Sequence, residues 1–300
     1  MTTTRILAAT DFSADGNTAV SRAGMLAREV AGELHLLHVL SDSPLRAISR
    51  LLPGAAIDAE AHLENAARAA MQELVTSLSA QQVRCAGDLV LSGRIGNRIT
   101  ETAAQINAGL LVLGARGDNP VREFLVGSNT EHVLRKSDRS LLAVRQPATG
   151  AYQRVLVATD FSAHAAHALQ LAGELAPQAT LFLLHVYDAP FEGKLAQAGV
   201  SVADIRRYHD EVRREFEHDM QAFVAALPPA LQARVQPRFA SGYTPGVILE
   251  QARSQQCDLV AVGKHGRSPV EEWVLGSVTL HTLRHAHCDV LATDRRSAAS

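Results

Sequence analysis

The stretch ATDFSA occupies residues 9–14 and occurs again, letter for letter, at residues 158–163, so the two copies start 149 positions apart. A second match, LLHV at 36–39 and at 183–186, has an offset of 147, which places a two-residue length difference in one loop. The later glycine matches return to an offset of 149: Gly93 with Gly242, Gly114 with Gly263, and Gly127 with Gly276. Several segments that agree on nearly one offset indicate an internal duplication.

Each copy is about the size of an ordinary domain, so the 300-residue chain is predicted to form two domains rather than a solenoid of short repeats. The boundary is predicted within the linker QPATGAY at 146–152, which gives domains at 1–148 and 149–300. Short apolar runs alternate with helical patterns in both halves. In the first half we expect five strands: 5–10, 33–40, 83–91, 109–115 and 140–145.

The helices expected between these strands follow the repeat of apolar residues at helical spacing, with a long one at 58–79 and another at 202–226 in the second half. Further helices are expected at 97–107 and 127–137. Strands that alternate with helices predict an α/β fold: in each half, a doubly wound parallel sheet of five strands covered on both faces. Ligands of such sheets bind at the carboxyl ends of the strands, where the strand order reverses.

Composition narrows the classes of partner. The net charge is −2, which argues against general binding to nucleic acid or to anionic membranes. The three cysteines are widely spaced and imply no disulfide framework, which favours a reducing compartment. No apolar run approaches the ~20 residues that span a bilayer, and the N-terminus lacks a secretion signal. A cytoplasmic protein is therefore expected.

A glycine motif follows an apolar strand in each half. GARG at 114–117 and GKHG at 263–266 are each followed, nine residues later, by a Gly-Ser pair that opens a helix. We expect the first glycines to let the backbone turn with positive φ, and the helix start to supply free N–H groups and a hydroxyl. The pattern is neither a P-loop nor the dinucleotide fingerprint. A tight turn with an N-capping serine is the alternative for one copy, and the presence of both copies favours a phosphate site.

G-x2-G-x9-G-[ST] after the fourth strand resembles the ATP-binding signature of the universal stress protein family, and the similarity covers essentially the whole chain. The resemblance implies an adenine-nucleotide α-hydrolase-like fold that binds ATP, with Mg²⁺ or Mn²⁺ bridging the phosphates. It maps the nucleoside contacts to Asp11 and Asp160 and the adenine contacts to Val39 and Val186. It maps the phosphate contacts in the first half to Gly114, Gly117, Gly127, Ser128 and Thr130. In the second half it maps them to Gly263, Gly266, Gly276, Ser277 and Thr279, and Val278 also matches the family pattern. Lys264 and His265 are added to this site because they flank the first glycines and suit a triphosphate.

Simpler structural roles are open for some of these residues. Asp11 and Asp160 precede a helix in T-D-F-S, where an aspartate can serve as the N-cap. Val39 and Val186 fit the core of a strand equally well, and the two roles are compatible. His38 and His185, inside apolar strands, are expected to be core histidines bonded to a neighbouring group.

The two halves differ in ways that favour the second site. Lys264, His265 and Arg267 surround its first glycines and suit a triphosphate, whereas Asp118 in the first half opposes an anion. Ser128-Asn-Thr-Glu131 matches a capping box, in which Glu131 competes with phosphate for the helix N–H groups. Asn129 stands where the second half has Val278.

Three readings of function follow. The first is a binding protein that responds to stress through an adenine nucleotide; the second is a slow ATPase of the same fold, without a legible catalytic base; the third is an adaptor with one or both sites empty. The duplication itself provides a pseudo-dimer within one chain and leaves a homodimer open. The pair His281 and His285 is weak support for zinc, so no metal site is assigned. The apolar loops at 44–57 and 190–200 are read as lids, partner patches or loops packed on their own domain.

Overall fold

The computed structural model describes residues 4–42, 53–115, 126–187, 198–266 and 275–294, without the side chains of 53–59 and 209. The chain divides into two compact units: residues 1–151 together with 288–300, and residues 152–287. The predicted boundary at 148 separates the two sequence repeats. The two compact units do not coincide with the repeats, because the last strand of the second repeat belongs to unit 1.

Among the described residues, unit 1 contains five strands of the first repeat and one strand of the second, with helices between them. In chain order these are β1 (Arg5–Ala9), α1 (Ala14–Glu29), β2 (Glu33–Ser41), α3 (Pro53–Ala80), β3 (Cys85–Gly93), α4 (Ile95–Gln105), β4 (Leu110–Gly114), α5 (Ser128–Lys136), β5 (Ser140–Val144) and β10 (Asp289–Thr293).

Unit 2 repeats the same alternation, with a short additional helix before its third strand. Its elements are β6 (Arg154–Ala158), α6 (Ala163–Leu175), β7 (Thr180–Tyr187), α8 (Val202–Ala225), α9 (Pro229–Gln232), β8 (Val235–Ser241), α10 (Thr244–Ser254), β9 (Leu259–Gly263) and α11 (Ser277–His285). Five strands per repeat are as predicted, and most predicted ends lie within two residues of the observed ones. The helix predicted at 58–79 is longer, at Pro53–Ala80.

The strand order is β3-β2-β1-β4-β5 in the first repeat and β8-β7-β6-β9 in unit 2, and all these neighbours are parallel. The chain runs outward from β1 through β2 and β3, then crosses to β4 on the other side. The order therefore reverses between β1 and β4, and equally between β6 and β9. This reversal opens a crevice at the carboxyl ends of those strands.

One pairing departs from the expected parallel sheet. β10 pairs with β5 antiparallel, with Leu291 opposite Leu142. Strand patterning could not reveal this, because β5 and β10 are fully buried apolar runs that fit either direction.

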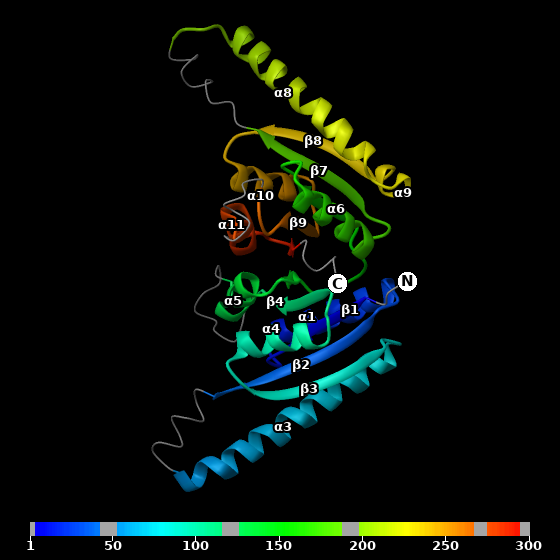
Figure 1. Cartoon of the computed structure of the whole chain (residues 1–300), viewed down its shortest axis with the longest axis vertical. Coiled ribbons are helices and arrows are strands. Elements are labelled where there is room, and N and C mark those ends of the chain that lie inside the picture. Colours follow the sequence, from blue (N-terminus) through cyan, green and yellow to red (C-terminus); the bar gives the residue numbers. More distant parts are fainter. Residues whose placement is uncertain (1–3, 43–52, 116–125, 188–197, 267–274, 295–300) are drawn as a thin grey trace. The chain divides into compact units, whose positions relative to one another are not determined.

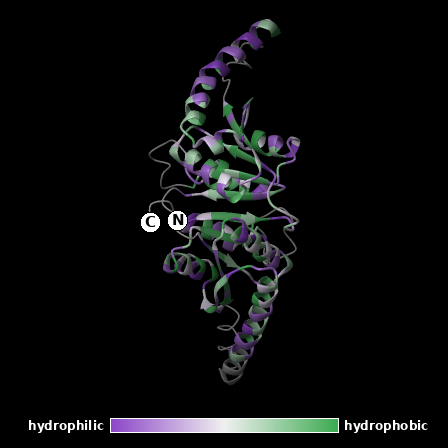
Figure 2. Ribbon diagram, turned by 90° about the vertical axis from the view of Figure 1, so that its right-hand side faces the viewer, coloured by the Kyte–Doolittle hydropathy of each residue, from purple (hydrophilic) through white to green (hydrophobic). Residues whose placement is uncertain are grey.

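The strands form the core, and long helices cover them. Ile6, Leu7 and Ala8 of β1 are completely buried, as are Leu110, Leu111 and Val112 of the adjacent β4. Figure 2 shows the strands of both units as largely hydrophobic. α1 packs on β1 and β4, while α3 lies along β3 (Figure 1). Within the described part of the chain, no helix combines the length and the apolarity needed to cross a bilayer.

Candidate functional site

Two crevices occupy the predicted positions, one in each repeat. The first is bounded by the end of β1 at Thr10 and Asp11, by Val39 of β2, and by the start of α5 at Gly127. The second crevice is bounded by the equivalent ends of β6, β7 and β9 and by the start of α11. The carboxyl ends of parallel strands thus bring together residues that are far apart in the sequence.

The turn T-D-F-S shapes one wall of each crevice. Asp160 Oδ1 accepts a hydrogen bond from the Ser162 N–H (3.0 Å), and Ser162 Oγ accepts one from the Ala165 N–H (3.2 Å). Ser162 is therefore the N-cap of α6. The first repeat has the same arrangement, with Ser13 as the N-cap of α1. The alternative in which the aspartates cap these helices is wrong, because the serine two residues later does so.

The same turn contains a strained residue in each repeat. Phe12 and Phe161 both have φ = 63°, a region that costs a non-glycine residue energy. The Phe161 ring stacks on His185, with centroids 4.4 Å apart, and Phe12 stacks on His38 at 4.3 Å. These contacts hold the aspartate just before the phenylalanine at the mouth of the crevice.

The histidines beneath these rings are bonded as expected. His185 Nδ1 lies 2.9 Å from the Thr159 carbonyl oxygen, and His38 Nδ1 lies 2.9 Å from that of Thr10. Because a carbonyl oxygen only accepts, Nδ1 carries the proton in both rings. Both histidines therefore fasten the second strand of a repeat to the end of its first strand.

The glycine loop is closed by two hydrogen bonds in each repeat. In the second, the Gly276 N–H donates to the Lys264 carbonyl (2.9 Å) and Thr279 Oγ1 donates to the Gly263 carbonyl (2.7 Å). In the first, the Gly127 N–H donates to the Ala115 carbonyl and Thr130 Oγ1 to that of Gly114, both at 2.9 Å. Thr130 and Thr279 are almost completely buried. They fix the helix start against the strand end.

The expected positive φ is wrong for Gly114 and Gly263, the glycines that end β4 and β9. Among the described glycines, positive φ occurs at Gly93, Gly199 and Gly242, and Gly276 has φ = −58°. Lack of space explains the glycine at 263. A Cβ there would lie 3.1 Å from His164 Cβ and 3.3 Å from the His265 carbonyl oxygen.

The helix starts at the crevices carry no side-chain cap. α11 begins at Ser277 after the N-cap Gly276, and α5 begins at Ser128 after the N-cap Gly127; neither N-cap makes a side-chain hydrogen bond. The first N–H groups of such helices lack intrahelical acceptors and attract anions. The capping box predicted from Ser128 to Glu131 is wrong, because Ser128 is already inside the helix. The Glu131 carboxylate pairs with Arg135 at 2.9 Å.

The crevices differ in size. The second encloses about 400 Å³ and the first about 120 Å³. Ligand pockets typically measure roughly 300–1,000 Å³, so the second crevice is in that range and the first is below it. At three lining positions the first repeat has a larger or more polar side chain than the second, which narrows the first crevice or makes its lining polar. Ile95 stands where the second repeat has Thr244, Leu113 where it has Val262, and Asn129 where it has Val278.

The structure gathers most of the predicted residues around these crevices. The first is lined by Asp11, Val39, Gly114, Gly127 and Thr130. The second is lined by Asp160, Val186, Gly263, His265, Gly266, Gly276, Ser277, Val278 and Thr279. Lys264 is instead 1% exposed and is not among the residues that line the second crevice, and Ser128 opens α5 without lining the first. Gly117, Asp118 and Arg267 lie outside the described residues.

Several lining residues were not predicted from the sequence. They are Gly16, Ile95, Ile99, Leu113 and Asn129 in the first crevice and Ala165, Leu184, His185, Thr244, Ile248 and Val262 in the second. Gly93 and Gly242, just before the segments that hold Ile95 and Thr244, were matched in the sequence. Asn129 has a predicted counterpart, Val278, whereas the other missed residues have none, so comparing the repeats would not have identified them.

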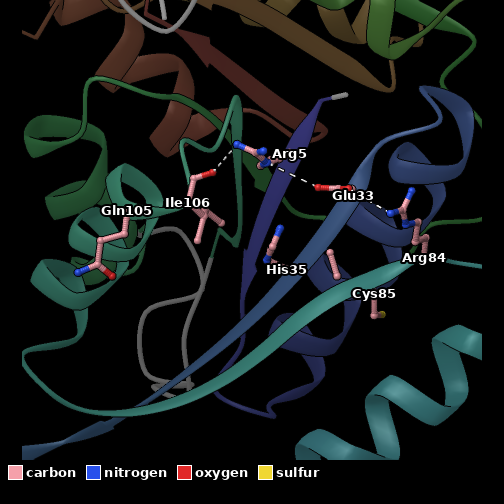
Figure 3. Close-up of a pocket in the computed structure, with 8 residues that line it drawn as sticks. Arg5, Glu33, His35, Arg84, Cys85, Gln105 and Ile106 are labelled. Atoms are coloured by element: carbon pink, nitrogen blue, oxygen red, sulfur yellow. Dashed lines mark hydrogen bonds and ion pairs between the residues drawn. The ribbon is translucent and has the colours of Figure 1, made fainter. Parts of the chain in front are cut away.

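A more open hollow of about 680 Å³ lies in unit 1, at the amino ends of β1, β2 and β3 (Figure 3). Its charged groups bond to one another: Glu33 pairs with Arg84 at 3.3 Å and with Arg5 at 3.6 Å. Burial lowers the pKa of His35 there, which disfavours its charged form. Since the crevices that bind ligands in such sheets lie at the opposite ends of the strands, this hollow is not the candidate site.

The described residues hold no group of three or more histidine, cysteine, aspartate or glutamate side chains that could bind a metal ion. His281 and His285 lie on α11 with ring centroids 4.5 Å apart, and Tyr243 meets His281 edge-on at 6.0 Å.

Comparisons with known proteins agree with the duplication. The family model described as "Universal stress protein family" matches twice, over residues 2–145 and 151–294. Universal stress protein YxiE of Bacillus subtilis is 30% identical over 145 residues, which cover 47% of this chain and 97% of YxiE. Universal stress protein MJ0531 of Methanocaldococcus jannaschii is 25% identical over 149 residues, 48% of this chain and 83% of MJ0531. Each is similar to one repeat.

A solved structure matches across both repeats. The crystal structure of a universal stress protein from Archaeoglobus fulgidus covers 98% of this chain and 100% of its own, with a TM-score of 0.68 and 20% identity. At that identity the match shows the shared fold.

Proposed function

The chain belongs to the universal stress protein family, and from this premise we propose that it binds ATP or a related adenine nucleotide, chiefly in the crevice of its second repeat. The observation that carries the proposal is the volume of about 400 Å³ enclosed there between the ends of β6 and β9 and the start of α11. The resemblance in sequence suggests that the ligand is an adenine nucleotide. The larger volume of the second crevice suggests that the second repeat binds it.

The phosphate end of the ligand would lie at the start of α11. The N–H groups of its first turn and the positive end of its dipole favour an anion. Ser277 adds a hydroxyl and His265 a ring to the same wall. The Gly276 N–H is already given to the Lys264 carbonyl, so the proposal uses the N–H groups that follow Gly276. Mg²⁺ or Mn²⁺ would accompany the phosphates and neutralise part of their charge.

The adenine end would lie between apolar side chains. Val186 and Val278 line the crevice and are partly exposed, so they offer apolar surface to a base, with the buried Leu184 and Ile248 behind them. Asp160 is half-buried at the mouth, with one carboxylate oxygen bonded to the Ser162 N–H. A carboxylate accepts several hydrogen bonds, so Asp160 remains able to accept from a ribose hydroxyl.

We infer a regulatory role, in which occupancy of the crevice reports a stress or energy state to a partner. Binding without turnover is the proposed activity; slow hydrolysis is the alternative. With a net charge of −2, the chain is not proposed to bind nucleic acid. A cytoplasmic location stays a prediction.

Mass spectrometry of small molecules released from the purified full-length chain tests the proposal. We expect an adenine nucleotide, at less than one equivalent per repeat because the first crevice is small. A chain that releases none, and that shows no heat of binding with ATP, ADP, AMP or cyclic AMP, would overturn the proposal in favour of an adaptor. Steady release of phosphate from ATP, lost in Ser277→Ala, would instead identify the ATPase.

A further inference from the structure

The strand β10 is attached to unit 1 by a buried carboxylate. Asp289, the first residue of β10, is 1% exposed. Its Oδ1 accepts hydrogen bonds from the N–H groups of Arg145 (2.7 Å) and Gln146 (3.2 Å), which follow β5. Oδ2 lies 3.5 Å from Arg22 Nε. One carboxylate therefore joins β10 to the end of β5 and to α1.

Arg22 completes this cluster from α1. Its side chain is 6% exposed, and its Nη1 donates a 2.7 Å hydrogen bond to the carbonyl of Gly150 in the linker. A guanidinium at this depth needs an opposite charge, since a buried charge without a partner is strongly destabilising. Asp289 supplies that charge.

The two repeats do not share these residues. At the 149-residue offset, Arg22 corresponds to Leu171 and Asp289 corresponds to Ser140. The Ser140 hydroxyl accepts from the Asp294 N–H (3.3 Å), just as Asp289 accepts from the Arg145 N–H, so the two ends of the β5–β10 pair are related by an approximate two-fold. Leu142 and Leu291, also 149 apart, lie opposite each other at its centre. The backbone pairing of β5 with β10 is therefore symmetric, whereas the charged residues Arg22 and Asp289 occur at one end of the pair.

We propose that Arg22 and Asp289 make the edge of β5 specific for β10 and exclude a second copy of β5. If β5 paired with β5 of another chain, each Arg22 would face Ser140 in place of Asp289. Both guanidiniums would then lose the buried ion pair that Asp289 supplies, although each would still feel the charge of Glu29 on α1. Pairing of β5 with β10 keeps the ion pair between Arg22 and Asp289, and pairing of β5 with a second β5 loses it. Such a rejection of an alternative is how charged positions specify partners.

Engineered cysteines report which strands pair. Ala143 lies opposite Val290 in the antiparallel register, so an Ala143→Cys/Val290→Cys chain can form a disulfide across the pair. When these two cysteines are the only substitutions, we expect the disulfide to form within one chain. Mass spectrometry and non-reducing electrophoresis detect it. The same chain without the two substitutions controls for the native Cys288.

Moving the charge tests the specificity. In Ser140→Asp/Asp289→Ser, Arg22 finds its carboxylate on a second copy of β5 and none on β10. Light scattering should show at least a doubling of mass relative to the parent, and the 143–290 disulfide should be lost by at least tenfold. A variant with the parent's mass and an intact intrachain disulfide would overturn the proposal.

A second comparison decides the matter if the moved charge impairs folding. Asp289→Arg sets two guanidiniums against each other and should slow the 143–290 disulfide at least tenfold. Arg22→Asp/Asp289→Arg restores opposite charges and should recover the intrachain disulfide without a change in mass. Equal rates of disulfide formation in the parent and in Asp289→Arg would overturn the proposal.

Discussion

The two crevices share their strands and turns, yet the second encloses about 400 Å³ and the first about 120 Å³. The hydrogen bonds that close the glycine loop agree within 0.2 Å between the repeats, at 2.9 Å for Thr130 and 2.7 Å for Thr279. The duplication has therefore kept the framework of the site and most of its lining. The lining residues differ at four matched positions: Gly16 and Ala165, Ile95 and Thr244, Leu113 and Val262, Asn129 and Val278. A conserved framework shows where a site lies, and its lining decides whether a ligand fits.

The largest effect should come from filling the second crevice. Gly276 lines it, and a Cβ there would lie 3.3 Å from the Lys264 carbonyl oxygen and 3.4 Å from Thr279 Oγ1. We expect Gly276→Val to weaken ATP binding at least about 100-fold, roughly 2.7 kcal/mol. Titration calorimetry measures the loss. Gly127→Val, the matched change in the first repeat, should leave the affinity unchanged, and equal losses in both variants would remove the distinction between the repeats.

Widening the first crevice should produce the next largest effect. Ile95→Thr/Leu113→Val/Asn129→Val gives the first crevice the residues of the second at the three differing positions where its own side chain is larger or more polar. We expect a second ATP to bind per chain, with an affinity within about tenfold of the first, or roughly 1.4 kcal/mol. Calorimetric stoichiometry reports the change. A ratio that stays at one would mean that other positions close the first crevice.

A smaller effect should follow loss of the buried threonine hydroxyl. Thr279→Val leaves the Gly263 carbonyl without the hydroxyl that donates to it and should lower the free energy of unfolding by about 1–3 kcal/mol. Because that hydroxyl holds the helix start, ATP affinity should also fall several-fold. Thr130→Val should cost similar stability without changing affinity. Urea denaturation and calorimetry distinguish these outcomes, and an affinity loss in Thr130→Val would contradict the account.

The smallest effect concerns pH and lies outside the crevices. Burial lowers the pKa of His35 in unit 1 and of His287 in unit 2 from the ordinary value of 6.5. A histidine with a lowered pKa takes up a proton more readily in the unfolded chain, so stability present above pH 6.5 is lost as the pH falls below it. His35→Gln should reduce this loss. Urea midpoints between pH 7.5 and 5.5 test this, and identical profiles for His35→Gln and the unsubstituted chain would refute it.

Much of this arrangement could be predicted from the sequence, because the duplication repeats each signal. Apolar runs located the strands, and ATDFSA and the glycine pattern located the strand ends that form the crevices. The antiparallel β5–β10 pair could not be predicted, since a fully buried strand carries no mark of direction. The capping box failed because the sequence pattern fits whether Ser128 precedes the helix or begins it. The difference in volume between the two crevices depends on residues such as Ile95 and Thr244. Their side chains come to line a crevice only when the chain folds, so the sequence pattern did not reveal them.

The central claim is that one chain presents two homologous crevices of which the second binds the nucleotide. Titration calorimetry of the full-length chain with ATP, followed by the same titration of Gly276→Val, tests it directly. The account predicts one ATP per chain and loss of that site in the variant. Two equivalent sites per chain, or one site that survives in Gly276→Val, would contradict it.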